Sequence, residues 1–268
     1  MPKGYRKSRE PVDPLHKSPD YPVGGQFRQD NTPGLINPFE LMAQQLGAED
    51  TRQSRLSDPY TFIFKYAYTL DPHDSASPIK RFPDYPYIRF MIKEWLENHS
   101  IIVVKSRQMM ASWLFVALNL WLAMKYSGQY IFFISKKEDD AGWSSQLSLL
   151  SRAMFIHEHL PKELQYGFKR STQPAILTFP KKNSCIHGVS QDSDAVRQYT
   201  SSSVLCDEMA FQERSEQVFA SLKPTLDGRK TKMDIGNGNF IVLPKMVGVS
   251  TPNGKRNLFY KLVHDVNE

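Results

Sequence analysis

The pattern of apolar and polar positions divides the chain into a polar N-terminal stretch and a longer stretch patterned for a core. Residues 1–58 are rich in proline, glycine, aspartate and basic residues, and outside residues 37–47 they keep no helical or strand period. Such a composition buries too little apolar surface to form a core. We expect residues 1–58 to form an irregular arm or docking segment, with a plain flexible tail as the alternative.

Residues 59–268 alternate short apolar runs with segments of helical period. The apolar runs predict buried strands at 101–105, 130–135, 202–208 and 245–252, with an antiparallel pair or sheet edge at 175–179 and 184–189. The expected helices are 85–99, 112–126, 136–155, 215–226 and 257–263. This alternation predicts an α/β domain with a mostly parallel sheet flanked by helices. Ligands of such sheets bind at the carboxyl ends of the strands.

The net charge, the cysteine content and the apolar runs limit which classes of function fit this chain. The net charge of +6 permits a polyanionic partner such as nucleic acid, without requiring one. Cys185 and Cys206 have no metal-binding spacing, and the polar N-terminus has no apolar stretch typical of a secretory signal. The longest apolar run, residues 113–124, is too short to span a bilayer. We therefore expect a cytosolic protein with no membrane partner.

A loop with the sequence KSRQMMAS joins the first apolar strand to the helix that follows it. A strand, loop and helix in this order are typical of a phosphate-binding loop, which also needs a cation and a hydroxyl for magnesium. Ser112 supplies the hydroxyl at the start of the helix. The candidate nucleotide-binding residues are Lys105, Ser106, Arg107, Gln108, Met109, Met110, Ala111 and Ser112.

Met110 and Ala111 stand where such a loop usually has glycine and lysine. The Cβ of Met110 crowds a position where glycine lets the backbone approach the phosphates. Lys105 can supply the missing cation, because the loop curls around the phosphates and brings its two ends together. Arg107 is the rival candidate. A turn with no ligand remains the plain alternative.

Two further strand ends carry candidate chemistry. The apolar strand 202–208 ends in Asp207, which can hold magnesium, and Glu208, which can orient and deprotonate an attacking water. The strand 245–252 ends in Ser250, Thr251 and Pro252, where a sensor of the γ-phosphate would lie. Taken singly, each could be an ordinary polar strand end or turn.

These motifs in this order resemble the ATPase domain of the large terminase subunit, the DNA-packaging motor of tailed double-stranded DNA bacteriophages. The matching stretches within residues 80–268 are KSRQMMASW, YIFFISKKEDDA, VLCDEMAF and GVSTPNGKRNLFY. The resemblance implies a RecA-like (ASCE) P-loop NTPase core that uses ATP and Mg²⁺ to drive double-stranded DNA into a procapsid.

The resemblance also implies roles for individual residues. Some family members have the loop lysine where Lys105 stands. Ser250, Thr251 and Pro252 resemble the motif that couples hydrolysis to movement. Arg197 resembles an arginine that reaches the ATP of a neighbouring subunit, although its flanking residues match less well. A surface arginine is the alternative for Arg197.

The implied partners are double-stranded DNA, the phage portal protein and the small terminase subunit, with the chain assembled as a homo-oligomeric ring. The implied location is the host cytoplasm, docked on the procapsid. The family usually has a nuclease domain after the coupling motif, and the sequence ends soon after that motif. We expect no nuclease activity from the chain alone.

Two other functions fit parts of the pattern. A superfamily 2-type helicase or translocase shares an acidic pair and an STP-like motif, but it would need a second RecA-like domain. A degenerate nucleotide-binding fold could act as a docking subunit. Met110 and Ala111 favour the degenerate fold, whereas Asp207 and Glu208 argue against it.

Overall fold

The computed structural model describes residues 38–71, 73–190, 196, 200–228, 230–236 and 238–264. The chain divides into two units, Met1–Met42 and Ala43–Glu268. Of the first unit, only the start of helix α1 (Pro38–Arg55) is described. The predicted arm therefore lies mostly outside the described residues, whereas residues 43–58 belong to the second unit.

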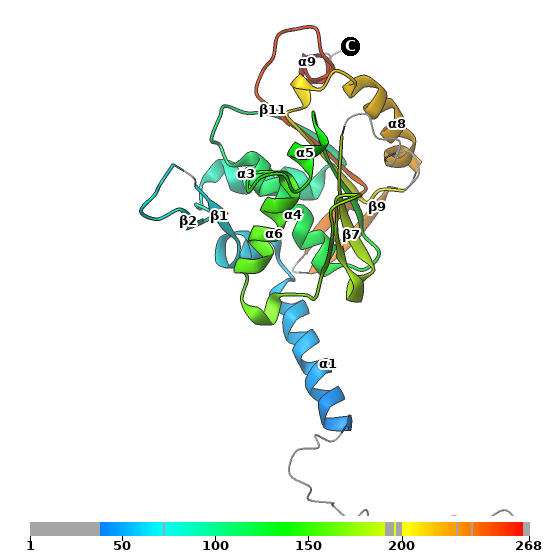
Figure 1. The fold of residues 1–268 in the computed structure, drawn as a ribbon. Helices are drawn as coiled ribbons and strands as arrows, with labels where there is room; N and C mark the ends of the chain where they lie inside the picture. The colour runs from blue at the N-terminus through cyan, green and yellow to red at the C-terminus, as the bar shows by residue number, and fades with distance from the viewer. Residues whose placement is uncertain are drawn as a thin grey trace, which may run out of the picture. The chain divides into compact units, whose positions relative to one another are not determined.

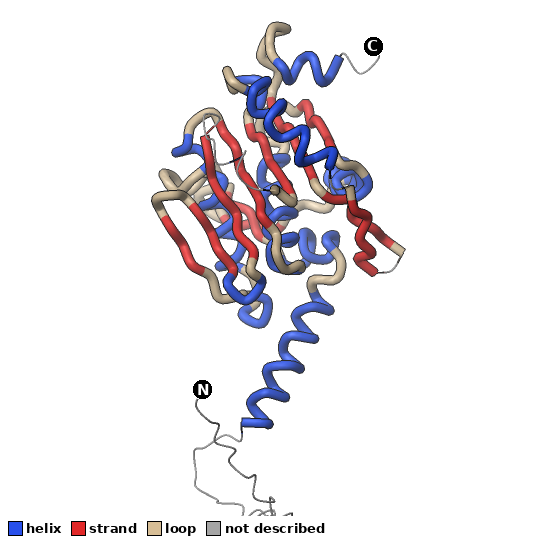
Figure 2. The backbone as a smooth tube through the Cα atoms, turned by 90° about the vertical axis from the view of Figure 1, so that its right-hand side faces the viewer, coloured by secondary structure: helices blue, strands red, loops and turns tan. Residues whose placement is uncertain are grey.

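A seven-stranded sheet forms the centre of the second unit, in the order β3-β11-β8-β4-β7-β6-β5. Its strands are β3 (Ser100–Val104), β4 (Tyr130–Ser135), β5 (Lys169–Ser171), β6 (Ile176–Phe179), β7 (Ser184–Ser190), β8 (Ser203–Asp207) and β11 (Lys245–Ser250). The five strands from β3 to β7 in this order run parallel, and β6 and β5 pair antiparallel at the edge. The strands lie side by side in Figure 2. The predicted mostly parallel α/β sheet is confirmed.

Helices cover both faces of this sheet. Since successive residues of a strand point to opposite sides, each strand contributes apolar side chains to a core on either face. On β4, Ile131 and Phe133 join the core beneath helices α3 (Pro86–Glu97), α4 (Ala111–Lys125) and α6 (Leu149–His159). Phe132 and Ile134 join a second core with helices α8 (Ser215–Gly228) and α9 (Leu258–His264). Figure 1 shows α3, α4 and α6 grouped together, away from α8.

Helix α4 is buried from Ala111 to Met124, which explains its continuous apolar sequence. Its Trp121 packs edge-on against Trp95 of α3, with 6.2 Å between ring centroids. The indole N–H of Trp121 donates a hydrogen bond of 2.8 Å to the carbonyl of Leu56. The helix that follows the candidate phosphate loop is thereby held rigidly in the core.

The single helix predicted over residues 136–155 is wrong. The structure has a short helix α5 (Glu138–Ala141), a turn, and then α6. Gly142 ends α5, and Ser148 Oγ shares its single proton between the carbonyls of Gly142 and Ser145, each 2.8 Å away across the turn. A serine-rich segment with local acceptors competes with helix formation in this way.

Two hairpins and several short helices complete the described part of the chain. The hairpins are β1 (Tyr68–Leu70) with β2 (Ile79–Arg81), and β9 (Thr231–Gly236) with β10 (Asn239–Leu243). The short helices are α2 (Pro59–Thr61), η1 (Phe62–Tyr66), η2 (Lys162–Leu164), η3 (Pro180–Lys182) and η4 (Met209–Phe211). Neither hairpin was expected, because β1 and β2 have three residues each and β9 is largely exposed, which leaves the apolar residues of β10 without a recognisable partner strand.

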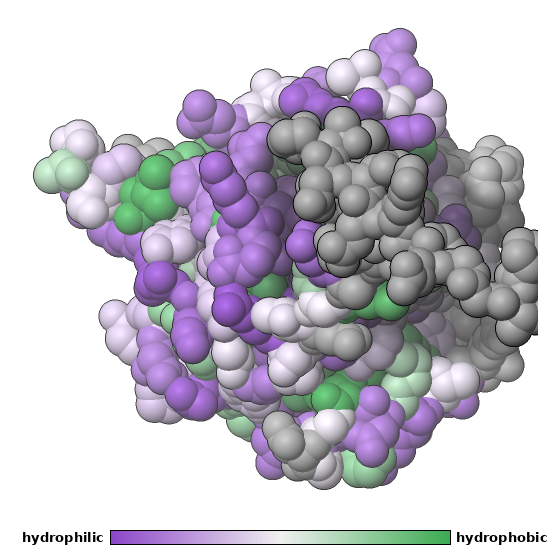
Figure 3. All heavy atoms as spheres, turned by 90° about the horizontal axis from the view of Figure 1, so that it is seen from below, coloured by the Kyte–Doolittle hydropathy of each residue, from purple (hydrophilic) through white to green (hydrophobic). Residues whose placement is uncertain are grey.

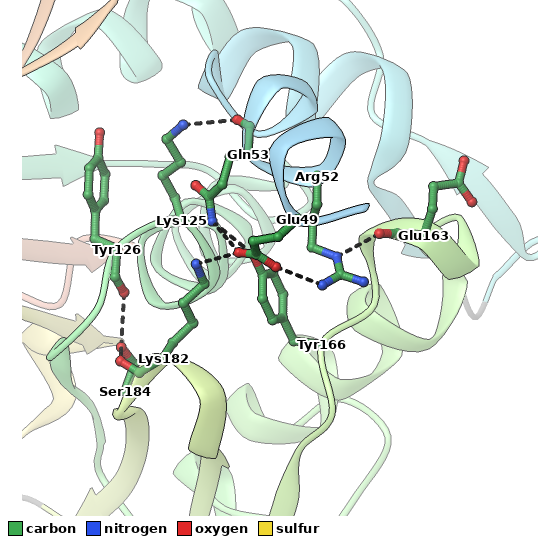
Figure 4. Close-up of polar contacts among 9 residues, drawn as sticks. All are labelled: Glu49, Arg52, Gln53, Lys125, Tyr126, Glu163, Tyr166, Lys182 and Ser184. Atoms are coloured by element: carbon green, nitrogen blue, oxygen red, sulfur yellow. Dashed lines mark hydrogen bonds and ion pairs between the residues drawn. The ribbon is translucent and has the colours of Figure 1, made fainter. Parts of the chain in front are cut away.

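The second half of α1 is attached to the domain through polar contacts around Glu49 (Figure 4). The Glu49 carboxylate accepts hydrogen bonds from Gln53 at 2.8 Å, Tyr166 at 2.8 Å and Lys182 at 2.9 Å. Partial burial acts to raise the pKa of Glu49, but these hydrogen bonds outweigh it and lower the pKa to about 2. Arg52 adds a 2.7 Å hydrogen bond from its Nε to the carbonyl of Glu163.

The surface is predominantly polar on the face drawn in Figure 3, where hydrophobic residues form separate small groups. None of the helices in the described ranges is long and apolar enough to cross a membrane.

Candidate functional site

Three neighbouring strands bring the three sequence motifs to one edge of the sheet. β11 lies between β3 and β8 and runs parallel to both. The candidate phosphate loop follows β3, the acidic pair ends β8, and Ser250 ends β11. The N–H of Lys105 donates a 3.0 Å hydrogen bond to the carbonyl of Ser250. Ser112 and Asp207 are 95 residues apart in the sequence, yet the three motifs form one site.

The candidate phosphate loop contains two residues in the left-handed region, Gln108 (φ 63°) and Met110 (φ 56°). This conformation is unfavourable for residues other than glycine, and it often marks functional sites. Met110 stands at the N-cap of α4 and makes no side-chain capping hydrogen bond. Its side chain packs against the core instead. The backbone thus adopts at Met110 a geometry that glycine usually supplies, and the amides at the start of α4 have no side-chain cap.

Ser112 and Asp207 form the buried part of the site. The Ser112 hydroxyl donates a 2.6 Å hydrogen bond to Oδ1 of Asp207, and the two residues are 7% and 8% exposed. Burial raises the pKa of the Asp207 carboxyl, and the positive charges of Arg152 and Lys105 and the Ser112 hydrogen bond oppose this effect. A hydroxyl and a carboxylate in contact at a strand end are oxygen ligands suited to Mg²⁺.

Lys105 and Glu208 form an ion pair beside them. Lys105 Nζ lies 3.1 Å from Glu208 Oε1, and the two side chains are 11% and 40% exposed. Glu208 also has a left-handed backbone (φ 51°), which turns the chain sharply at the end of β8. Arg107, the rival cation, is exposed. In this ion pair Lys105 is therefore largely buried, and Glu208 is the more exposed partner.

The residues of the third motif connect the ends of β11 and β8. Ser250 is fully buried, and its Oγ accepts a 3.2 Å hydrogen bond from the N–H of Ala210 and donates one of 2.9 Å to the carbonyl of Thr251, with Glu208 Oε2 at 3.4 Å as a weaker second acceptor. Asn253 Nδ2 donates a 3.1 Å hydrogen bond to the carbonyl of Ala210. Thr251 lines the cavity and Pro252 is exposed.

A cavity with two lobes opens over these residues. The lobes have volumes of 640 Å³ and 590 Å³ and share Lys105, Gln108, Leu147, Arg152, Asp207 and Glu208. The first lobe also reaches Arg107, Lys136 and Thr251. The second lobe extends to the β1–β2 hairpin and Tyr85, and it is lined by Met109, Met110, Ala111 and Ser112. Each lobe is in the size range of a small-molecule site.

The structure places the sequence candidates unequally. Seven of the eight loop residues line one lobe or the other, whereas Ser106 is exposed and donates only a weak 3.5 Å hydrogen bond to the carbonyl of Arg107. Arg197 lies outside the described residues. Among residues 38–264, apart from the gaps already given, no three or more His, Cys, Asp or Glu side chains form a metal-binding group.

Sequence reasoning missed Arg152. It lies in the first turn of α6, inside the segment that was expected to be one amphipathic helix, and no motif marks it. Its guanidinium carbon lies 5.4 Å from the ring centroid of Trp113, the residue after Ser112. Burial lowers the pKa of Arg152, and the charges of Asp207 and Glu208 oppose this effect. A second strongly basic group therefore lies at the acidic pair.

A mostly parallel sheet of this order, with a loop–helix junction after β3 and an acidic pair at the end of β8, gives the chain a RecA-like α/β fold. Within that class, solved large terminases have the same fold. The large terminase of bacteriophage HK97 superposes on 80% of this chain with a TM-score of 0.57 and 11% sequence identity. The ATPase domain of the large terminase of Thermus phage P74-26 superposes on 68% with a TM-score of 0.50 and 19% identity.

The chain spans 41% of the length of the HK97 protein and 69% of the P74-26 ATPase domain. No protein-family model and no curated protein sequence matches the chain. At these identities the structural likeness establishes the fold, and the chemistry has to be argued from the site.

Proposed function

We propose that the chain is an ATPase that hydrolyses ATP in the cavity at the ends of β3, β8 and β11. The observation that carries this proposal is the paired contact of Ser112 with Asp207 and of Lys105 with Glu208 in one cavity. A hydroxyl, two acids and a cation at the start of a buried helix are the groups that phosphoryl transfer requires.

Lys105 changes its partner in this mechanism. In the structure its ammonium pairs with Glu208. A triphosphate offers a higher negative charge, so the ammonium moves to the β- and γ-phosphate oxygens and leaves the Glu208 carboxylate to accept a proton. Glu208 then orients a water molecule and takes its proton as the water oxygen bonds to the γ-phosphorus. The bond from that phosphorus to the ADP oxygen breaks, and ADP and phosphate are formed.

Ser112 and Asp207 would hold Mg²⁺ together with the nucleotide. Their oxygens already face one another at 2.6 Å, and Asp207 is buried beside two cations. The ion, when bound, supplies charge neutralisation on the phosphate oxygens. Asp207 keeps its place through the hydrogen bond of 2.9 Å from Gln212 Nε2 to its carbonyl.

We further propose that hydrolysis drives double-stranded DNA into a phage procapsid, as in a large terminase motor. The likeness of fold to two large terminases supports this assignment. Ser250 Oγ contacts Glu208 Oε2 at 3.4 Å and donates to the carbonyl of Thr251 at 2.9 Å, and these contacts would carry a change at the γ-phosphate to the turn after β11, the proposed coupling segment. A ring on the portal, a small terminase subunit and the role of Arg197 remain parts of this proposal.

The test compares Glu208→Gln with the unchanged chain. Removing the base while keeping size should leave ATP binding within about threefold and lower turnover by about 10²- to 10⁴-fold. Glu213→Gln is the matched control, because Glu213 is exposed five residues further along and outside the cavity lobes that contain Glu208. Near-normal turnover in Glu208→Gln would remove the assigned base.

The same assay separates the motor from a docking subunit. Stimulation of turnover by double-stranded DNA is expected of the motor. Binding of ATP with no measurable hydrolysis by the unchanged chain, with or without DNA, would favour the degenerate docking subunit.

A further inference from the structure

Arg152 is a basic residue at the site for which the proposed hydrolysis mechanism has no role. It lines both lobes of the cavity together with Lys105, Asp207 and Glu208. It comes from α6, an element that carries none of the three sequence motifs. The site therefore receives a cation from a fourth segment of the chain, helix α6.

The guanidinium of Arg152 has no ion-pair partner in the part of the chain that the structure describes. Its Nε is enclosed and makes no hydrogen bond there. Buried charged groups are normally paired and hydrogen-bonded, since desolvation without compensation is costly. Lys245, another buried cation, donates hydrogen bonds to the carbonyls of Trp95, Leu96 and Asn98. Arg152 is thus a desolvated donor that still lacks an acceptor.

Packing against Trp113 accounts for the position of the arginine but leaves its enclosed Nε without an acceptor. A guanidinium presents five N–H donors in a planar fork that matches phosphate oxygens. The N-terminus of α6 adds to the positive potential, since Leu147 and Ser148, which precede the helix, also line the first lobe. An anion in the shared part of the cavity would satisfy the free Nε.

We propose that Arg152 binds the γ-phosphate of ATP from within the same subunit and so distinguishes ATP from ADP. This proposal rests on the proposed ATPase function. Asp207 and Glu208, which act at the reacting end of the nucleotide in that mechanism, line both lobes of the cavity together with Arg152. A trans-acting arginine such as the one proposed for Arg197 requires a neighbour, whereas Arg152 acts in an isolated chain.

The experiment measures the affinity of the complete chain for Mg–ATP and Mg–ADP by calorimetric titration at a low protein concentration that keeps it monomeric. Arg152→Met keeps the packing on Trp113 and removes the charge. We expect it to weaken ATP binding by about ten- to hundredfold and ADP binding by less than about threefold. Arg152→Lys, which retains charge without the fork, should recover part of the ATP affinity.

Arg170→Met is the matched control. Arg170 also lies over a tryptophan, at 4.3 Å from the Trp143 ring centroid, but it is exposed and outside both lobes. Arg170→Met should change the affinity for neither Mg–ATP nor Mg–ADP. Equal losses for ATP and ADP in Arg152→Met, or wild-type affinity for both, would overturn the γ-phosphate role and leave the ATPase proposal standing. If Arg152→Met does not fold, the loss of ATP affinity relative to the loss of ADP affinity is measured for Arg152→Lys instead. No binding of either nucleotide by the unchanged chain would overturn both proposals.

Discussion

Replacing Lys105 by alanine tests which cation serves the phosphates. The Lys105 ammonium lies 3.1 Å from Glu208 Oε1 and its side chain is only 11% exposed, whereas Arg107 is exposed. A charge-assisted contact with phosphate in such a partly desolvated place contributes about 1.5–3 kcal/mol. We therefore assign the larger loss of ATP affinity to Lys105→Ala.

The ion pair with Glu208 reduces this value. ATP has to displace the carboxylate, and a pair whose acid is 40% exposed contributes about 0.5 kcal/mol or somewhat more. The net loss of binding free energy is then about 1–2.5 kcal/mol, which corresponds to about five- to seventyfold in the dissociation constant. Turnover should fall further if the contact shortens in the transition state.

Titration of Mg–ATP into Lys105→Ala, Arg107→Ala and Lys105→Arg, with thermal unfolding of each, measures the effect. Arg107→Ala should lose less than about threefold, because an exposed arginine binds phosphate in competition with water. Lys105→Arg should recover little, since a planar fork does not replace a compact ammonium in a tight loop. A silent Lys105→Ala combined with a severe Arg107→Ala would refute the assignment of Lys105.

Two further predictions concern stability. Lys245→Met should lower the free energy of unfolding in urea by about 2–3 kcal/mol, because it leaves the carbonyls that end α3 without their buried donor. Lys261→Met, which removes a surface pair with Glu216, should cost about 0.5 kcal/mol or less, and equal costs would contradict the reasoning. The second prediction concerns acid. The pKa of Glu49 is about 2 in the folded chain and 4.5 in the reference state, so its contribution to stability is complete above pH 4.5 and is lost as the pH falls towards 2. Urea unfolding at pH 5 and pH 3 should show a smaller pH dependence for Glu49→Gln than for the unchanged chain, and equal dependence would rule out this role.

The sequence by itself determined the strands of the parallel sheet and the residues at their ends. Runs such as residues 131–134 are apolar at every position because helices cover both faces of a parallel sheet. Such runs mark strands without any long-range information. The loop KSRQMMAS and the pair Asp207 and Glu208 could be recognised for the same reason, since ligand sites follow the carboxyl ends of these strands.

Local pattern failed where polar contacts outweighed periodicity. Residues 136–155 have helical spacing, yet Gly142 and the hydrogen bonds of Ser148 divide them into α5, a turn and α6. The hairpin β9–β10 was missed although β10 contains the apolar run 240–243, because β9 is largely exposed and offers no matching run. Helix α1 extends beyond its short periodic stretch, where Glu49 and Arg52 bind partners more than 100 residues away.

Only the tertiary structure decided how the site is assembled. Strand order places β11 between β3 and β8, and this order cannot be read from the sequence. The order sets Lys105 against Glu208 and Ser112 against Asp207. Arg152 joins them because the turn after α5 starts α6 at the cavity, and Trp113 supports its guanidinium. Contacts of this kind depend on the packing of segments that are distant in the chain, and periodicity records only which face of each segment is buried.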